Sequence, residues 1–188
     1  ILDLSNPKNP VQEKSIYISK IAASKRNLPE GSPRQVEIYG HYAFVPIFGS
    51  GMQVVDLKKL IVGASDDECK VSFYEAAGAI EVKVYSRAAT ETQPEQTVAL
   101  LLENYFGLHI IDFTNVGNPN VLSTYKYGSH WMFKGLELAQ DFPVDLDANG
   151  KLEENEKKDL VFFSVLNLYK IMVVDITKPN VVFLYREI

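Results

Sequence analysis

Residues 107–119 read Gly107-Leu108-His109-Ile110-Ile111-Asp112-Phe113-Thr114-Asn115-Val116-Gly117-Asn118-Pro119, and similar stretches occur at three other places in the chain. The other copies are Ile1-Leu2-Asp3-Leu4-Ser5-Asn6-Pro7-Lys8-Asn9-Pro10, Gly51-Met52-Gln53-Val54-Val55-Asp56-Leu57 and Ile171-Met172-Val173-Val174-Asp175-Ile176-Thr177-Lys178-Pro179. Each copy contains an apolar run that ends in aspartate. We therefore expect a buried strand that meets a turn, where the aspartate carboxylate accepts backbone N–H groups.

The copies recur at a period that is typical of β-propeller blades. The aspartates Asp3, Asp56, Asp112 and Asp175 are separated by 53, 56 and 63 residues (56 − 3, 112 − 56 and 175 − 112). Repeats of this length, filled with strand-forming residues, predict four-stranded blades that stack around an axis. We expect an all-β fold, a fragment of a β-propeller with about three and a half four-stranded blades.

The whole chain is expected to belong to one propeller domain. Residues 1–33 would be the end of a blade plus a loop, and residues 34–78, 79–130 and 131–188 would each be a blade. The strands of the second blade are expected near Gln35–Tyr39, Tyr42–Ile47, Met52–Leu57 and Lys70–Glu75, with Ser65–Glu68 as an acidic turn. In the first blade, Ile1–Leu4 and Val11–Ser19 are expected to be the third and fourth strands. Because the chain opens inside a strand without an initiator methionine, we interpret it as an excerpt from a longer protein.

Composition excludes some classes of function. The 188 residues carry a formal net charge of −5, with a sequence pI near 5.3, so no basic face indicates nucleic-acid binding. No apolar run is long enough to cross a membrane as a helix. A single cysteine, Cys69, excludes an internal disulfide framework, and its acidic neighbours favour an inert thiol.

The repeated runs resemble the LVIVD repeat. The resemblance rests on Leu108–Asp112, Met52–Asp56 and Ile171–Asp175, and on the Asn-Pro or Lys-Pro turns that follow most copies; in the second blade Lys58-Lys59-Leu60 takes the place of such a turn. Proteins with this repeat are generally secreted or surface-attached propellers. The resemblance therefore implies an extracellular or cell-surface binding scaffold more than an enzyme.

A calcium-binding loop is the sharpest chemical signal in the sequence. The segment Asp145-Leu146-Asp147-Ala148-Asn149-Gly150-Lys151-Leu152-Glu153-Glu154-Asn155-Glu156 fits the spacing of a calcium loop, with oxygen side chains at positions one, three and five and glycine at six. The expected ligands are Asp145, Asp147, Asn149 and the Lys151 carbonyl, closed by Glu153 or Glu156. Pro143 and the preceding strand pattern leave no room for the entering helix of an EF-hand. The loop is instead similar to those of FG-GAP propeller blades, and the alternative is a solvated acidic turn.

Aromatic residues are expected to gather on one face of the propeller, formed by the connections between strands two and three and between successive blades. They are Tyr105, Phe106, His130, Trp131 and Tyr169. These residues are either anchors for a partner or packing between blades. His41 and His109 have no neighbours in sequence that indicate a metal site or a catalytic triad, so each is interpreted as a hydrogen-bonded structural histidine.

Two classes of function remain open. The first is a non-catalytic, calcium-stabilised scaffold that binds a protein partner or assembles with copies of itself. The second is a propeller enzyme, a hydrolase or lyase, whose site lies at the central channel on blades outside this sequence. The inner strands carry Arg34, Glu37, Glu81, Lys83, Lys134 and Glu137, which are scattered and of mixed sign. This distribution favours the scaffold.

Overall fold

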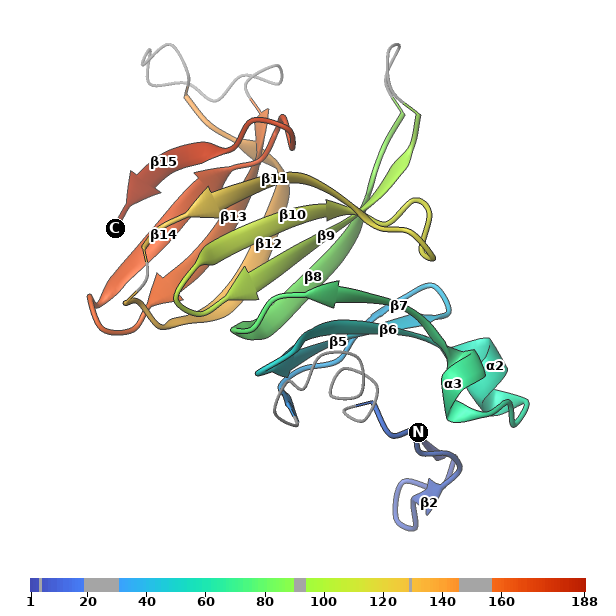
Figure 1. The fold of residues 1–188 in the computed structure, drawn as a ribbon. Coiled ribbons are helices and arrows are strands. Elements are labelled where there is room, and N and C mark those ends of the chain that lie inside the picture. The colour runs from blue at the N-terminus through green and yellow to red at the C-terminus, as the bar shows by residue number, and fades with distance from the viewer. Residues whose placement is uncertain (4, 19–30, 90–93, 129, 146–156) are drawn as a thin grey trace.

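The computed structural model describes residues 1–3, 5–18, 31–89, 94–128, 130–145 and 157–188. The fold is all-β and consists of antiparallel sheets that follow one another along the chain (Figure 1). The N-terminal sheet pairs β1 (Leu2–Asp3) with β2 (Val11–Gln12). The repeated sheets confirm the predicted fold class, a β-propeller-like fragment.

The second sheet is built on β5 (Tyr42–Phe48), β6 (Gly51–Asp56) and β7 (Lys70–Glu75). Two short strands, β3 (Ser32–Pro33) and β4 (Glu37–Tyr39), both pair with β5. Two short helices, α2 (Leu57–Ile61) and α3 (Asp66–Cys69), connect β6 to β7.

The third and fourth sheets each have four strands in simple up-and-down order. The third contains β8 (Ala79–Arg87), β9 (Gln96–Glu103), β10 (Gly107–Asp112) and β11 (Asn120–Lys126). The fourth contains β12 (Phe133–Pro143), β13 (Lys157–Val165), β14 (Lys170–Asp175) and β15 (Phe183–Glu187). The first strand of the third sheet, β8, contacts both neighbouring sheets: it lies against β4 and β5 of the second sheet and against β12, the first strand of the fourth.

The core lies between the faces of successive sheets. One cluster joins the second and third sheets, with Phe44 and Met52 packed against Leu101 and Phe113. A larger cluster joins the third and fourth sheets, and it includes Leu100 and Ile110 from one side and Phe163 and Met172 from the other. The third sheet therefore buries both of its faces by stacking on its two neighbours, as the repeat pattern predicts.

Two structural details recur in the three larger sheets, at the end of the third strand. The register between the third and fourth strands shifts at Val54/Val55, at Ile110/Ile111 and at Val173/Val174, which are equivalent positions. An aspartate follows each shift and accepts the backbone N–H of the residue two positions later: Lys58 to Asp56 (2.9 Å), Thr114 to Asp112 (2.8 Å) and Thr177 to Asp175 (2.9 Å). In the N-terminal sheet, Asp3 accepts the N–H of Ser5 in the same way (2.8 Å). The predicted role of the aspartates at strand ends is confirmed.

The connection from β6 to β7 differs from the prediction. Leu57 begins α2 instead of ending a strand, and Asp56 is the N-cap of that helix, accepting the backbone N–H groups of Lys58 and Lys59. Residues 66–69 are helical as well, because Ser65 and Glu68 form a reciprocal capping box that stabilises the first turn. The predicted acidic turn is therefore a capped helix. In the first sheet, a strand was expected at Val11–Ser19; among the described residues of that range, 11–18, only Val11–Gln12 form a strand.

Candidate functional site

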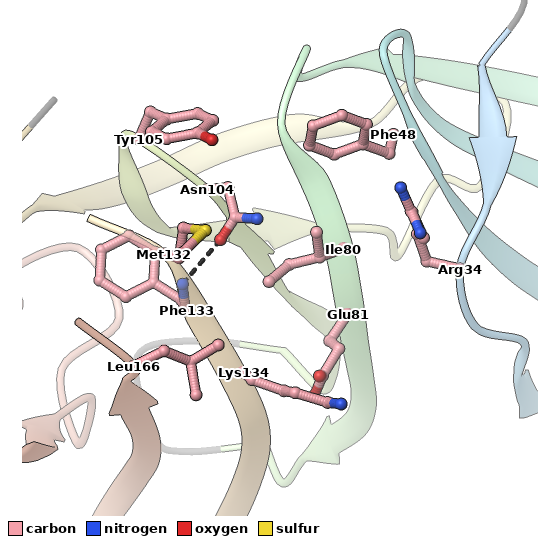
Figure 2. Close-up of a pocket in the computed structure, with 10 residues that line it drawn as sticks. All are labelled: Arg34, Phe48, Ile80, Glu81, Asn104, Tyr105, Met132, Phe133, Lys134 and Leu166. Carbon is pink, nitrogen blue, oxygen red and sulfur yellow. Dashed lines mark hydrogen bonds between the residues drawn. The ribbon is translucent and has the colours of Figure 1, made fainter. Parts of the chain in front are cut away.

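A pocket of about 470 Å³ lies where the first strands of three sheets converge (Figure 2). Its floor and walls come from Ile80 and Glu81 at the start of β8, and from Phe133 and Lys134 at the start of β12. Of the remaining lining residues, Arg34 precedes β4, Phe48 ends β5 and Met132 precedes β12. Asn104, Tyr105 and Leu166 belong to connections between second and third strands. Pockets of this volume are typical of ligand sites.

Backbone hydrogen bonds fix the rim of the pocket. The Asn104 side-chain oxygen accepts the backbone N–H of Phe133 (2.7 Å), and Tyr105 donates its backbone N–H to the carbonyl of Trp131 (3.0 Å). Leu166 in turn donates to the carbonyl of Met132 (2.9 Å). The loop between β9 and β10 and the loop after β13 are thus both tied to the segment before β12, so the lining side chains are held on a rigid frame.

Glu81 has a structural role in this pocket. Its carboxylate oxygens accept the backbone N–H groups of Gly135 (3.0 Å) and Leu136 (2.8 Å). These two residues lie at the register shift between β12 and β13, where the regular ladder is interrupted. The carboxylate therefore ties the first strand of the third sheet to the first strand of the fourth.

The polar groups that remain available to a ligand are mainly cationic. The guanidinium of Arg34 lies 4.9 Å from the ring centroid of Phe48, a distance that permits a cation–π interaction. Arg34 and Lys134 are both exposed, and neither forms an ion pair with a carboxylate in the described part of the chain. Figure 2 shows Arg34 and Phe48 on one side of the pocket and Met132, Phe133 and Leu166 on the other. The site can thus receive a ligand with both apolar and polar parts.

The lining residues include no serine, cysteine or histidine. The charged side chains of the pocket are Arg34, Glu81 and Lys134.

The five residues that were predicted to share a face all lie in connections between second and third strands or between the third and fourth sheets, but their surroundings differ. Tyr105 lines the pocket, and Trp131 packs against the core between the third and fourth sheets. Phe106 stacks on His109, with 4.6 Å between ring centroids, while Tyr169 is 96% exposed. The carbonyl of His130 accepts a hydrogen bond from the Asn167 side chain (3.0 Å). Tyr105 and Trp131 are joined by their backbones, and only Tyr105 reaches the pocket.

A buried hydrogen-bond network that the sequence did not reveal is centred on His109. Its Nε2 lies 2.6 Å from a Glu103 oxygen, and its Nδ1 lies 3.0 Å from the Tyr74 hydroxyl. Glu103 also accepts the backbone N–H of Gly78 (3.0 Å), so the network joins the second and third sheets. Burial, together with the charge of Glu103, raises the pKa of Tyr74 to about 12. His109 is hydrogen-bonded, as predicted, but Tyr74 is remote in sequence and no local pattern indicated it.

The other residues considered from the sequence occupy separate places. His41 lines a second pocket, of about 360 Å³, together with Tyr39 and Phe113. Cys69 is buried, and burial raises the pKa of its thiol, with Asp66 adding to the effect. The predicted inert character of this cysteine agrees with that environment.

The predicted calcium loop falls largely outside the described residues. Asp145 lies within them, whereas Asp147, Asn149, Lys151, Glu153 and Glu156 do not. Across the described ranges, no three His, Cys, Asp or Glu side chains are grouped so that they could hold a metal ion. In the same ranges, no helix is long and apolar enough to cross a membrane.

Comparison with known proteins gives one match. The sequence model of the LVIVD repeat matches residues 30–59, which include β3 to β6 and the start of α2. No curated protein and no solved structure matches the chain. The match and the sheet-rich fold together support a repeat protein with β-propeller-like architecture.

Proposed function

We propose that this chain is part of a non-catalytic β-propeller that binds a protein partner. The pocket at the starts of β8 and β12, the first strands of the third and fourth sheets, is the observation that carries the proposal. It combines exposed apolar side chains with cations, on a frame fixed by backbone hydrogen bonds, and this is how a rigid scaffold presents anchor sites. In this proposal residues 1–188 form one domain, with blades at 34–78, 79–130 and 131–188 and the end of a blade in 1–33.

Calcium binding and an extracellular or surface location belong to the same proposal. The spacing of Asp145, Asp147 and Asn149, with Gly150 after them, supports a calcium loop in the connection between β12 and β13. Extracellular calcium modules have weak sites that are filled at the high calcium concentration outside cells. The resemblance to secreted and surface-attached LVIVD-repeat proteins supports that location.

A peptide selection tests partner binding at the pocket. A library of displayed peptides is selected on the wild-type protein, and the enriched peptides are then measured on Met132→Asp and on Tyr169→Ala. Met132 is an exposed residue of the pocket and Tyr169 is an exposed aromatic outside it. We expect peptides that lose binding to Met132→Asp and keep it with Tyr169→Ala. A selection whose peptides all tolerate Met132→Asp would contradict binding at this site.

Assembly with a second copy is the other candidate, and it is favoured by the outer face of the fourth sheet. Leu108 and Ile110 of the third sheet are buried under the fourth sheet. Their equivalents in the repeat are Ile171 and Val173; Val173 is buried, whereas Ile171 is 44% exposed. Sedimentation equilibrium tests this candidate: we expect self-association by the wild type that Ile171→Asp weakens at least about tenfold. Identical, purely monomeric behaviour of both proteins would remove the candidate.

A further inference from the structure

We infer that the pocket recognises a carboxylate, carried by an acidic segment of the protein partner. The inference rests on the proposed function, since it names the chemistry of the ligand at the same site. Its basis is that two cations, Arg34 and Lys134, line the same pocket and are not occupied by an ion pair within the described residues, as some other cations of the chain are. Lys83 lies 3.3 Å from Glu137 and Lys170 lies 2.5 Å from Glu187, so these cations are already paired. Arg34 and Lys134 form no ion pair with a described carboxylate.

Arg34 is held in an orientation that suits a carboxylate. Its guanidinium lies over the Phe48 ring, which restricts the side chain while the N–H groups at the edge of the plane remain available. A guanidinium can donate two parallel hydrogen bonds to one carboxylate, and such bonds are stronger than those between neutral groups. A preoriented guanidinium also loses less rotamer freedom when the ligand binds.

Glu81 does not cancel this selectivity. Both of its oxygens already accept backbone N–H groups, from Gly135 and Leu136. A ligand cation would therefore meet a carboxylate whose oxygens are engaged, and it would be repelled by Arg34 and Lys134. With two cations and one anion, the lining carries an excess of one positive charge, although the chain as a whole carries −5.

The apolar wall indicates what flanks the carboxylate. Met132 and Leu166 are exposed at the pocket, and Tyr105 presents a ring on the same rim. Apolar groups beside the acidic group would cover these side chains. A short segment with a glutamate between aromatic residues, or with a C-terminal carboxylate that follows an aromatic residue, has this chemistry.

Three peptides test the inference: acetyl-Phe-Glu-Phe-amide, acetyl-Phe-Gln-Phe-amide, and acetyl-Phe-Gln-Phe with a free C-terminal carboxylate. Binding is followed by the chemical shifts of the backbone amides of Asn104, Tyr105 and Phe133. We expect at least one carboxylate peptide to bind about tenfold or more tightly than the neutral peptide, and to weaken as salt is added. The peptide that binds more tightly tells whether the carboxylate comes from a side chain or from a chain end.

Variants assign the effect to Arg34. Arg34→Gln should remove the preference for the carboxylate, and Arg34→Lys, which keeps the charge without the two-pronged geometry, should retain part of it. Arg186→Gln makes the same charge change on exposed β15 and should leave the preference intact. Equal binding of all three peptides at the pocket amides overturns the inference and leaves the proposed binding site standing. Absence of any shift at these amides overturns the inference, and the peptide selection then decides the proposed function independently.

Discussion

At the scale of single residues, the aspartate at the end of each third strand is a structural element of the repeat. In all four copies its side chain accepts the N–H two residues later, so the turn closes the same way each time. Asp112 also accepts a hydrogen bond from Gln96 (3.1 Å), and Asp175 forms an ion pair with Lys158 at the corresponding place in its own sheet. A catalytic site needs different groups that converge, whereas these groups are alike and lie in separate sheets.

We expect Asp112→Ala to lower the free energy of unfolding by about 1–2 kcal/mol, because the Thr114 N–H loses its acceptor. Urea denaturation measures this change. Asp112→Asn keeps an oxygen acceptor and should lower the free energy of unfolding by less than Asp112→Ala does. The matched control is Asp67→Ala on the exposed surface of α3, for which a change within about 0.5 kcal/mol is expected. If Asp112→Asn folded normally but abolished peptide binding, the structural role of the aspartate would be wrong.

The raised pKa of Tyr74 predicts a loss of stability in alkaline solution. Tyr74 ionises near its usual value of 10 when unfolded and only at about 12 when folded, so the folded state keeps the proton across this interval. The protonated Tyr74 hydroxyl therefore makes its full contribution to the free energy of unfolding below pH 10, and this contribution is lost as the pH rises toward 12. We expect the free energy of unfolding to fall less steeply over this interval in Tyr74→Phe than in the wild type. Parallel curves for the two proteins would contradict the assignment.

At the scale of elements, the start of the third strand requires glycine in the second and third sheets. Gly107 opens β10 with φ 140°, and a Cβ there would lie 2.0 Å from the Tyr125 carbonyl oxygen on β11. Gly51 is in the same situation at the start of β6, 2.0 Å from the Tyr74 carbonyl oxygen. The fourth sheet has Lys170 at this position, and its preceding loop is one residue longer. Glycine therefore occurs at this position where the preceding turn is shorter, and a residue with a side chain occurs where it is longer.

We expect Gly107→Ala to destabilise the protein by about 3 kcal/mol or more, because the backbone of β10 or β11 must move to admit the methyl group. The measurement is the midpoint of urea unfolding. Lys170→Ala is the control at the equivalent position, where a side chain already fits, and it should change stability by less than about 1 kcal/mol. Equal effects of the two substitutions would show that the close approach to Tyr125 is not what selects glycine.

The sequence predicted the strands well because their signal is local. Apolar runs that end in aspartate placed β6, β10 and β14 to within a residue or two. Ser65–Glu68 was predicted to be an acidic turn, although the Ser65/Glu68 spacing is a capping-box signature that could have revealed α3. The pocket and the His109 network could not be read from the sequence. Both depend on residues that stacking brings together from different sheets, such as Arg34 with Lys134 and Tyr74 with His109.

At the scale of the whole molecule, the sheets act as one stack because side chains cross between them. Arg87 of the third sheet donates to the carbonyl of Thr177 (3.0 Å), and Ser123 donates to the carbonyl of Pro179. Together with the shared apolar cores, these contacts couple the unfolding of each sheet to that of its neighbours. Anything that stabilises one sheet should therefore raise the melting temperature of the described stack.

The proposed calcium loop offers a direct test of this coupling. In this proposal the carboxylates of Asp145, Asp147, Glu153 and Glu156 would repel one another in the metal-free chain, and a divalent cation would convert that repulsion into coordination. Calcium at one hundred times its dissociation constant would add about 2.7 kcal/mol of stability if it binds only the native state. For a chain of this size, that corresponds to a rise of about 5–10 °C in melting temperature.

Thermal melts with calcium, with magnesium and with a chelator measure the effect. We expect calcium to raise the melting temperature and magnesium to do so far less, because its small octahedral shell suits a wide, many-ligand loop badly. Asp147→Ala should remove most of the calcium increment, whereas Asp67→Ala, an equal charge change on α3, should keep it. If Asp147→Ala responded to calcium as the wild type does, the loop would be an acidic surface turn and the stack would owe its stability to the sheet cores alone.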